Sequence, residues 1–537
     1  MQAAQTVDAA SLKQWLHDGD EIALLDVREH GEYGEAHLFY GVPLPFSRLE
    51  TGLGRLVPRR SCRIVMYDDG VSGVAARAAD RAVSYGYERV FTLAGGAAAW
   101  RHAGFELFAG VHVPSKTFGE LVEHAEAVPS IAAADLRKLL AEGGDVVVVD
   151  SRPVDEYRKM NIPGSLCCPN GELAYRIGQI VTDPATTVVV NCAGRTRSII
   201  GAATLRRFGV RNPVLALENG TMGWRLAGFD LEHGSSRLYP DAPAAERLDR
   251  LKHKAGEIAS RHGVSRIEAA TVAKWLTDRT ARTTYLLDIR TEEEFRADGL
   301  PGAVWAPGGQ LLQATDQWLG VRNARVVLTD DNEVRAILVA SWLTQLGWET
   351  HVLAGGVEAG RGRISVPPGM IGGGLLRFPP VSAAELGRRG AQTRFFDVRS
   401  SMEYRTGHIK GAFWATRARL EKALEQVEGR EVVVIAGDDM VGRAFAADLE
   451  RAGCRIAGIH LGSPERWREA GLVMEATPQS PPDAECIDYL FFVHDRHDDN
   501  LEAARQYIAW ETGLADRIDR QERAAFRIPE NRHAEAS

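Results

Sequence analysis

The sequence has few cysteines, no long apolar segment and no excess of basic charge. Six cysteines in 537 residues, without regular spacing, exclude a disulfide framework as the basis of the fold. No apolar run reaches the roughly 18 residues that span a bilayer, so we expect no membrane association. A formal net charge of −8 gives no basic surface for nucleic acid. These absences favour an ordinary soluble protein.

Length and composition narrow the class further. Residues 1–11 lack a basic stretch followed by an apolar core, which predicts no secretory signal and a cytoplasmic protein. A chain of 537 residues is too long for one core and predicts about three to five domains. Hydrophobic and charged contents of 45% and 25% are those of a globular protein.

One set of features recurs four times along the chain. Each copy has an apolar run that ends in an Asp-x-Arg tripeptide, followed by an acidic–aromatic pair, a second apolar strand, an Ala-rich helix and a glycine-bearing turn. A single Asp-x-Arg would mean little, but four copies in register with the other features make coincidence a poor explanation. The tripeptides are Asp26-Val27-Arg28, Asp150-Ser151-Arg152, Asp288-Ile289-Arg290 and Asp397-Val398-Arg399.

Short apolar strands that alternate with amphipathic helices predict a mostly parallel sheet flanked by helices in each repeat. We therefore expect an α/β protein of four tandem domains of about 100 residues each. Linker lengths favour a closer pairing of the first domain with the second, and of the third with the fourth, than of the second with the third. The expected bounds are 1–110, 127–235, 263–362 and 377–476, with a C-terminal α/β docking tail over 483–537.

The second repeat contains the stretch with the strongest chemical signal. Residues 188–190 form an apolar strand that runs into Cys192, a loop with a glycine and two arginines follows, and residues 199–205 are typical of a helix. Backbone N–H groups and the helix dipole make such a loop an anion-binding cradle. A thiol there, beside Arg195 and Arg197, should ionise more readily than a free cysteine and act as a nucleophile.

These motifs together resemble the rhodanese (sulfurtransferase) family. The resemblance is carried by the tripeptides, the Pro163-Gly164-Ser165 turn, the strand that runs into Cys192, and the closure by Asn219-Gly220 and Trp224. It covers residues 1 to about 476 as four tandem rhodanese-like domains and is specific in the second. It implies that a cysteine takes a sulfane sulfur from thiosulfate, mercaptopyruvate or a small persulfide and passes it to cyanide, a thiol or a protein acceptor, without a cofactor.

Applied residue by residue, the resemblance makes Cys192 the catalytic nucleophile and persulfide carrier. Arg195 and Arg197 would attract and orient an anionic donor. Backbone amides of the loop would cradle the terminal sulfur and stabilise the persulfide anion, so no metal ion is needed. The substrate-binding residues are therefore Ala193, Gly194, Arg195, Thr196, Arg197 and Ser198.

Two other functions stay open. Cysteine phosphatases and arsenate reductases have a Cys-x5-Arg loop that fits a tetrahedral oxyanion, whereas the shorter spacing from Cys192 to Arg197 fits a single sulfur. A non-catalytic scaffold or redox sensor would use Cys192 only to register oxidants. A purely structural Cys192 is disfavoured, because two arginines are poor companions for a core residue.

The other three copies of the loop lack a thiol at this place. The second strand of each runs into Asp68-Asp69, Asp330-Asp331 or Gly437-Asp438-Asp439. A carboxylate cannot carry sulfane sulfur, so we expect these domains to be inactive and to shape the active cleft, bind a partner or hold a homodimer together. We interpret the acidic pairs as helix caps rather than metal sites.

Some residues near the active loop have two interpretations. Cys167 and Cys168 follow the glycine turn and could relay sulfur, but buried strand residues are the preferred interpretation. The Asp150-Ser151-Arg152 tripeptide and Glu156 could orient Arg197, although their equivalents in the other repeats favour a structural role.

The repeat pattern ends near Pro478. Residues 489–493 are strongly apolar and are expected to form a buried strand. A charged loop follows, and then a helix with Leu501, Ala504 and Ile508 on one face. Because the apolar run would be costly to expose, we expect this tail to dock on another domain.

Overall fold

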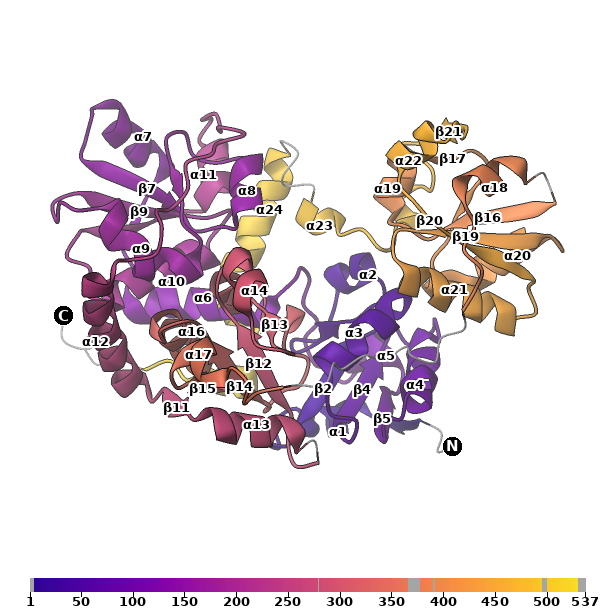
Figure 1. Cartoon of the computed structure of the whole chain (residues 1–537), viewed down its shortest axis with the longest axis horizontal. Helices are drawn as coiled ribbons and strands as arrows, with labels where there is room; N and C mark the ends of the chain where they lie inside the picture. The colour runs from indigo at the N-terminus through magenta and orange to yellow at the C-terminus, as the bar shows by residue number, and fades with distance from the viewer. Residues whose placement is uncertain (1–3, 279, 366–376, 390–391, 495–499, 530–537) are drawn as a thin grey trace. The chain divides into compact units, whose positions relative to one another are not determined.

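The computed structural model describes residues 4–278, 280–365, 377–389, 392–494 and 500–529. Four α/β domains follow one another, and each has a parallel sheet with helices packed on it (Figure 1). The predicted fold class is confirmed. Within the described residues, no helix is long and apolar enough to cross a membrane.

The first three sheets share one strand order, β1-β5-β4-β2-β3 and its equivalents β6-β10-β9-β7-β8 and β11-β15-β14-β12-β13. The central strand of the second sheet, β9 (Thr187–Asn191), has four consecutive buried residues, because helices cover both faces of the sheet. The other strands of these sheets are β1 (Gln5–Val7), β2 (Ile22–Asp26), β3 (Val42–Pro43), β4 (Arg63–Tyr67), β5 (Arg89–Leu93), β6 (Ser130–Ile131), β7 (Val146–Asp150), β8 (Leu166–Cys167), β10 (Val214–Leu217), β11 (Ser265–Ile267), β12 (Thr284–Asp288), β13 (Val304–Trp305), β14 (Arg325–Thr329) and β15 (Glu349–Leu353).

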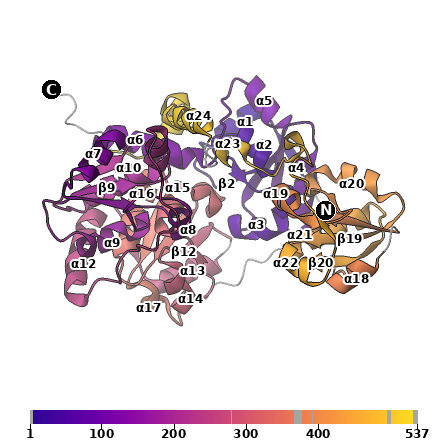
Figure 2. The same cartoon turned by 90° about the horizontal axis from the view of Figure 1, so that it is seen from above.

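The helices of these three domains include two that precede the domains they lead into, α6 (Val113–Glu126) and α12 (Ala245–His262). Helix α10 lies beside α6 in both views (Figures 1 and 2). The others are α1 (Ala9–Trp15), α2 (His30–Glu35), η1 (Phe46–Arg48), α3 (Leu49–Leu56), α4 (Val74–Ser84), α5 (Gly96–His102), α7 (Ala133–Ala141), α8 (Val154–Lys159), α9 (Asn170–Ile180), α10 (Thr196–Arg207), α11 (Gly220–Leu226), α13 (Ala269–Thr277), α14 (Glu292–Asp298), α15 (Gly308–Gln313), η2 (Thr315–Gln317), α16 (Val334–Gln345) and α17 (Gly356–Gly360).

The fourth domain varies this plan. Its parallel sheet has the order β18-β16-β19-β20, and β17 pairs with β21 in a separate antiparallel ribbon. Its elements are β16 (Thr393–Asp397), β17 (His408–Ile409), β18 (Phe413–Trp414), β19 (Glu431–Ala436), β20 (Ile456–Leu461), β21 (Met474–Glu475), α18 (Ala383–Arg388), α19 (Ser401–Thr406), η3 (Arg417–Arg419), α20 (Leu420–Val427), α21 (Asp439–Arg451) and α22 (Pro464–Glu469).

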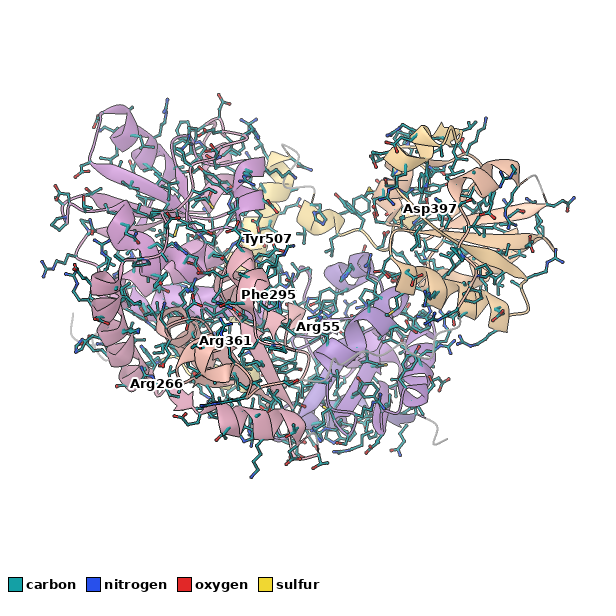
Figure 3. The ribbon with its side chains drawn as sticks, viewed as in Figure 1. Arg55, Arg266, Phe295, Arg361, Asp397 and Tyr507 are labelled. Carbon is teal, nitrogen blue, oxygen red and sulfur yellow. The ribbon has the colours of Figure 1, made fainter. Side chains whose placement is uncertain are left out.

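Every Asp-x-Arg tripeptide forms the same internal clamp at the end of its strand. In the second domain the Arg152 guanidinium donates two hydrogen bonds to the buried Asp150 carboxylate, at 2.9 and 2.7 Å, and a third to the carbonyl of Met160. The first, third and fourth domains repeat the pair; Figure 3 labels its Asp397, in the fourth sheet. The clamp ties each strand to the segment that follows, which is a structural duty.

The domains group into two compact units. One holds the first and fourth domains with the tail as far as Val493; the other holds the second and third domains with the tail from His494. The pairing that we expected from linker lengths is therefore wrong. Ion pairs join the domains within each unit instead. Arg417 of the fourth domain binds Glu50 of the first, and Arg335 of the third binds Glu172 of the second.

The tail is mostly helical. The apolar run that we expected as a strand instead leads into a short helix, α23 (Phe491–His494). The remaining elements are η4 (Asp483–Glu485), α24 (Leu501–Thr512), α25 (Leu514–Arg517) and α26 (Arg520–Ala524). Helix α24 packs on α11 and α6 of the second domain.

Candidate active site

Cys192 lies directly after β9, at the carboxyl end of a central strand, and α10 begins four residues later at Thr196. Cys192 is 2% exposed. The start of α11 holds the loop in place, because the backbone N–H groups of Thr221 and Met222 donate hydrogen bonds to the carbonyls of Cys192 and Ala193, at 2.9 and 3.2 Å. Gly220 has a left-handed φ of 55°, and a Cβ there would clash with the Cys192 carbonyl. The thiol is thus held on a rigid support.

The loop presents polar groups to the thiol. The thiol donates to the Ser198 hydroxyl, with 3.6 Å between Sγ and Oγ, and that hydroxyl donates in turn to the Arg195 carbonyl at 2.8 Å. Among the described residues, the backbone N–H groups of Gly194, Arg195, Arg197 and Ser198 have no hydrogen-bond acceptor. Donors left over at the start of a helix are suited to binding an anion.

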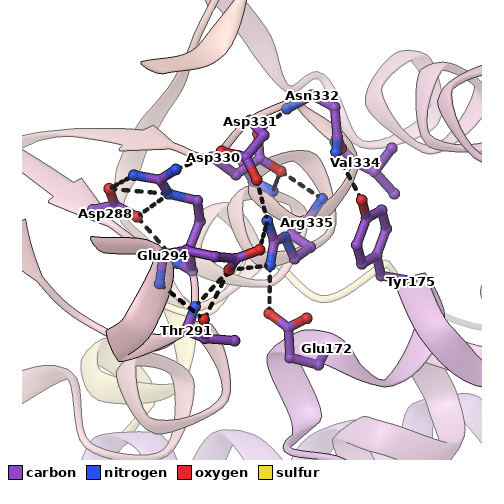
Figure 4. Close-up of polar contacts among 12 residues, drawn as sticks. Glu172, Tyr175, Asp288, Thr291, Glu294, Asp330, Asp331, Asn332, Val334 and Arg335 are labelled. Carbon is purple, nitrogen blue, oxygen red and sulfur yellow. Dashed lines mark hydrogen bonds and ion pairs between the residues drawn. The ribbon is translucent and has the colours of Figure 1, made fainter. Parts of the chain in front are cut away.

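The equivalent loop of the third domain shows an anionic group bound by four such N–H donors. There Asp330 follows β14 as Cys192 follows β9, and its buried carboxylate accepts N–H bonds from the equivalent four positions (Figure 4). The bonds from Asn332, Glu333, Arg335 and Ala336 measure 3.1, 2.5, 2.9 and 3.1 Å. In the third domain four N–H groups therefore converge on one carboxylate at the end of the strand, and the second loop differs in backbone at Arg195, where φ is −122° against 69° at Glu333.

The first and fourth domains depart from this arrangement. The Asp68 carboxylate accepts N–H bonds from Gly70 and Ala75 at 2.8 and 3.0 Å. In the fourth domain the pairing of Asp397 with Ile435 puts Ala436 at the place of Cys192, and Asp438 caps α21 by accepting from Val441. Within the described residues, no group of three or more His, Cys, Asp or Glu is placed to hold a metal ion.

Arg195 points away from the thiol towards α6. Its guanidinium binds Glu120, at 2.8 and 2.9 Å, and also Glu123. Burial raises the pKa of Glu120, against the lowering effect of Arg195, and the nearby Glu511 and Glu123 raise it further. Since two carboxylates already neutralise Arg195, its expected role in attracting an anionic donor stays a prediction.

Arg197 is held by its own domain and by the next one. Glu156 accepts two hydrogen bonds from it, both 2.8 Å long, and Gln310 of the third domain accepts another at 2.8 Å. Although burial disfavours the charge, Glu156 keeps the pKa of Arg197 above its ordinary value, with a further contribution from Cys192. Glu156 therefore does reach Arg197, whereas Asp150 and Arg152 serve their own clamp.

The C-terminal tail supplies a side chain that sequence reasoning missed. Glu511 of α24, 1% exposed, accepts a hydrogen bond from Thr196 at the start of α10, at 2.8 Å, and binds Lys116 of α6 at 3.1 Å. Tyr507 of the same helix places its ring near the Lys116 ammonium group, 5.3 Å away (Figure 3). In the described part of the repeats no helix corresponds to α24, so comparison of the repeats gave no signal for Glu511.

Gln310 was missed as well, but a signal for it existed. It stands at the same distance along the chain from Asp288 as Glu172 does from Asp150. Each of these two residues binds the arginine of the other domain. Gln310 binds Arg197 of the second domain, and Glu172 binds Arg335 of the third at 2.7 Å (Figure 4).

Cys167 and Cys168 are both fully buried. Cys167 ends β8 and Cys168 follows it, and strand β7 lies between β8 and β9. Burial raises the pKa of both thiols, and Asp150 adds to the effect at Cys167 and Glu172 at Cys168. A raised pKa opposes the thiolate that a sulfur relay needs, which favours the packing role.

The fold and the loop define a class of tandem α/β protein in which one repeat has a cysteine at the carboxyl end of its central strand. The model of the Rhodanese-like domain matches residues 8–103, 132–227, 269–362 and 382–470, more than half of the chain. The protein therefore belongs to the rhodanese-like family, as four tandem domains.

The chain is similar to two proteins of known structure or sequence. The crystal structure of a thiosulfate sulfurtransferase from Pseudomonas aeruginosa is 39% identical, with a TM-score of 0.90 over 98% of this chain and 99% of that one. The HTH-type transcriptional regulator Rv0324 of Mycobacterium tuberculosis is 33% identical over 94 residues, which are 18% of this chain. The match spans only 41% of that regulator, less than half of its length. The chain thus has the fold of a sulfurtransferase family.

Proposed function

We propose that the protein is a sulfurtransferase that carries sulfane sulfur as a persulfide on Cys192. The observation that supports this most is the set of four N–H groups around the thiol that lack an acceptor among the described residues, and whose counterparts in the third domain hold an anionic carboxylate. A terminal persulfide sulfur is a small anion, and donors already in place stabilise it without rearrangement.

The first half-reaction loads the sulfur. The Cys192 thiolate attacks the outer, sulfane sulfur of thiosulfate, a new S–S bond forms, and the original S–S bond breaks with its electron pair leaving on sulfite. The N–H groups of the loop and the dipole of α10 stabilise the thiolate before attack and the persulfide anion after it. Before it loses its proton, the Cys192 thiol donates a hydrogen bond to the Ser198 hydroxyl, 3.6 Å from Sγ.

The second half-reaction releases the sulfur. A nucleophilic acceptor, such as cyanide, a thiol or a protein thiolate, attacks the terminal sulfur, and Cys192 leaves as the thiolate that begins the next cycle. Arg197, kept charged by Glu156, favours an anionic donor near the loop. Thiosulfate is the donor suggested by the Pseudomonas aeruginosa relative.

Intact mass spectrometry tests the proposal. After incubation with thiosulfate and desalting, the chain should gain the mass of one sulfur atom, and cyanide should remove it with formation of thiocyanate. Cys192→Ser should gain nothing, while Cys62→Ser, which changes another buried thiol, should load normally. Absence of added sulfur from thiosulfate and from a small persulfide would rule the proposal out. Release of phosphate from an aryl phosphate that depends on Cys192 would establish the phosphatase instead.

A further inference from the structure

The unit formed by the first and fourth domains contains a pocket of about 110 Å³ that shares no residue with the candidate active site. Its walls come from α2 and η1 of the first domain, from the segments after β16 and β18 of the fourth, and from the tail residue Asp488. The tail is fixed here, because the Ile487 carbonyl accepts a 2.7 Å hydrogen bond from Gly31 and Asp488 accepts one of 2.8 Å from Ser401. Three segments that are distant in sequence thus meet around one small space.

Glu29 is anomalous at its position. It forms the capping box of α2 with a carboxylate, whereas the equivalent residues of the third and fourth domains, Thr291 and Ser400, use a hydroxyl. Glu29 is 3% exposed, and its Oε2 accepts a hydrogen bond from Ser47 at 2.9 Å. Its Oε1 has no hydrogen-bond partner among the described residues. Burying such an oxygen is costly, and a serine would meet the needs of the fold.

A second carboxylate faces the same space. Oδ1 of Asp488 is also buried without a partner among the described residues. Burial raises the pKa of Glu29 to about 7, in spite of the Ser47 hydrogen bond, and the charges of Asp488 and Glu32 raise it further. Two acceptor oxygens therefore lack a donor among the described residues, and the charge of Asp488 destabilises the charged form of Glu29.

The cations around the pocket do not supply that donor. Arg399 is bound to Asp397, and Arg417 is bound to Glu50 and Asp448. Arg48 is exposed, lines the pocket and forms no ion pair within the described part of the chain. The charged groups that face Glu29 are Glu32 and His30 of α2, Arg48 of η1, Arg399 and Arg417 of the fourth domain, and Asp488 of the tail.

We propose that this pocket binds a small amino acid. Its ammonium group would donate to Oε1 of Glu29 and Oδ1 of Asp488, and its carboxylate would pair with Arg48 at the mouth. An ammonium group offers three N–H donors, which suits two orphaned oxygens, whereas two carboxylates are too few ligands for a tightly held metal ion. The pocket's volume admits a ligand of only a few heavy atoms.

Calorimetric titration of the full chain with glycine at pH 8 tests this inference. Glycine should bind, methylammonium more weakly, and acetate not at all, because the ammonium group makes the buried contacts. Glu29→Ser introduces at α2 the kind of hydroxyl cap that Ser400 provides in the fourth domain. It should weaken glycine binding by at least about tenfold. Glu35→Gln, which removes a charge from the same helix outside the pocket, should leave it unchanged.

The pH dependence provides a second readout. Glu29 has a pKa of about 7 in the folded chain against an ordinary 4.5, so its stabilising effect is present below pH 4.5 and is lost as the pH rises through 7. Glycine should therefore bind more tightly at pH 8 than at pH 6 and raise the melting temperature most at pH 8. No heat from glycine and methylammonium at pH 8, equal binding by acetate, or unchanged affinity in Glu29→Ser would each overturn the proposal.

Discussion

The loops after β9 and β14 stand at equivalent places in their sheets but differ in backbone and in content: φ is −122° at Arg195 and 69° at the equivalent Glu333. In the second domain Cys192 faces N–H groups without acceptors among the described residues; in the third, the Asp330 carboxylate uses all four of their equivalents. The third loop has satisfied its hydrogen bonds and has no nucleophile. The second has a thiol at this place, and four of its N–H groups have no acceptor among the described residues. If the proposed function holds, the third loop serves stability and the second serves chemistry.

The surroundings of the two loops repeat the contrast. Arg197 and Arg335 occupy equivalent positions, and each binds a glutamate of its own domain, Glu156 or Glu294. The neighbouring domain then adds the neutral Gln310 to Arg197 but the charged Glu172 to Arg335. Among the described residues Arg197 thus has one carboxylate partner, whereas Arg335 has three, Glu172, Glu294 and Asp331.

Replacing the thiol of the second loop by the carboxylate of the third should have the largest effect. In Cys192→Asp, the new carboxylate should accept the N–H bonds that Asp330 accepts in the third domain, and sulfur loading should be lost completely. The melting temperature should equal or exceed that of the parent protein, because the donors gain an acceptor. Mass spectrometry after thiosulfate and a thermal melt measure both effects. A variant that is inactive and clearly less stable would show that the N–H groups of the second loop do not converge on the new carboxylate.

Removing the carboxylate of the third loop should lower the free energy of unfolding without affecting sulfur loading. Asp330→Ala removes the acceptor of four backbone N–H groups, so we expect a loss of about 2–4 kcal/mol in the free energy of unfolding of its unit. Asp438→Ala, which removes only a helix cap, should cost about 1 kcal/mol. Chemical denaturation compares them, with sulfur loading at Cys192 as the control for an intact second domain. Equal losses in the two variants would contradict the comparison.

The repeats made the local parts of this picture predictable. The Asp-x-Arg clamps join residues two apart, and the Cys192 loop follows from a strand, a glycine and a helix start that are adjacent in sequence. For the same reason the fold of each domain could be predicted from its own strands and turns. The loop residues 193–198 lie together because they are contiguous.

Contacts between distant segments could not be predicted in this way. The pairing of domains depends on faces such as those joined by Arg335 and Glu172, which no linker length encodes. Arg195 was expected to face a donor, yet its partners Glu120 and Glu123 come from a helix between domains that has no repeat pattern of its own. Glu511 lies in a tail without counterparts. Such side chains reach the loop only through the packing of distant segments.

Exchanging the neutral partner of Arg197 for the charged one tests the electrostatic half of the comparison. Gln310→Glu should raise KM for thiosulfate by about tenfold with little change in kcat, because a second carboxylate repels the dianionic donor. The effect should shrink at high salt. Gln310→Met separates loss of the hydrogen bond from gain of charge, and Glu172→Gln makes the mirror change at Arg335. A rise in KM for Glu172→Gln as large as that for Gln310→Glu would refute a local effect.

The smallest expected effect concerns the tail, which contacts the Cys192 loop through Thr196. Glu511→Gln keeps a hydrogen-bond acceptor for Thr196 but weakens the bond and removes the ion pair with Lys116, so we expect kcat for sulfur transfer to fall by about fivefold. Glu502→Gln, an exposed change on the same helix, serves as the control. The double variant Lys116→Met with Glu511→Gln removes both charges. If Glu511 positions the start of α10 through Thr196, the double variant stays slow; full recovery would mean that Glu511 only neutralises Lys116.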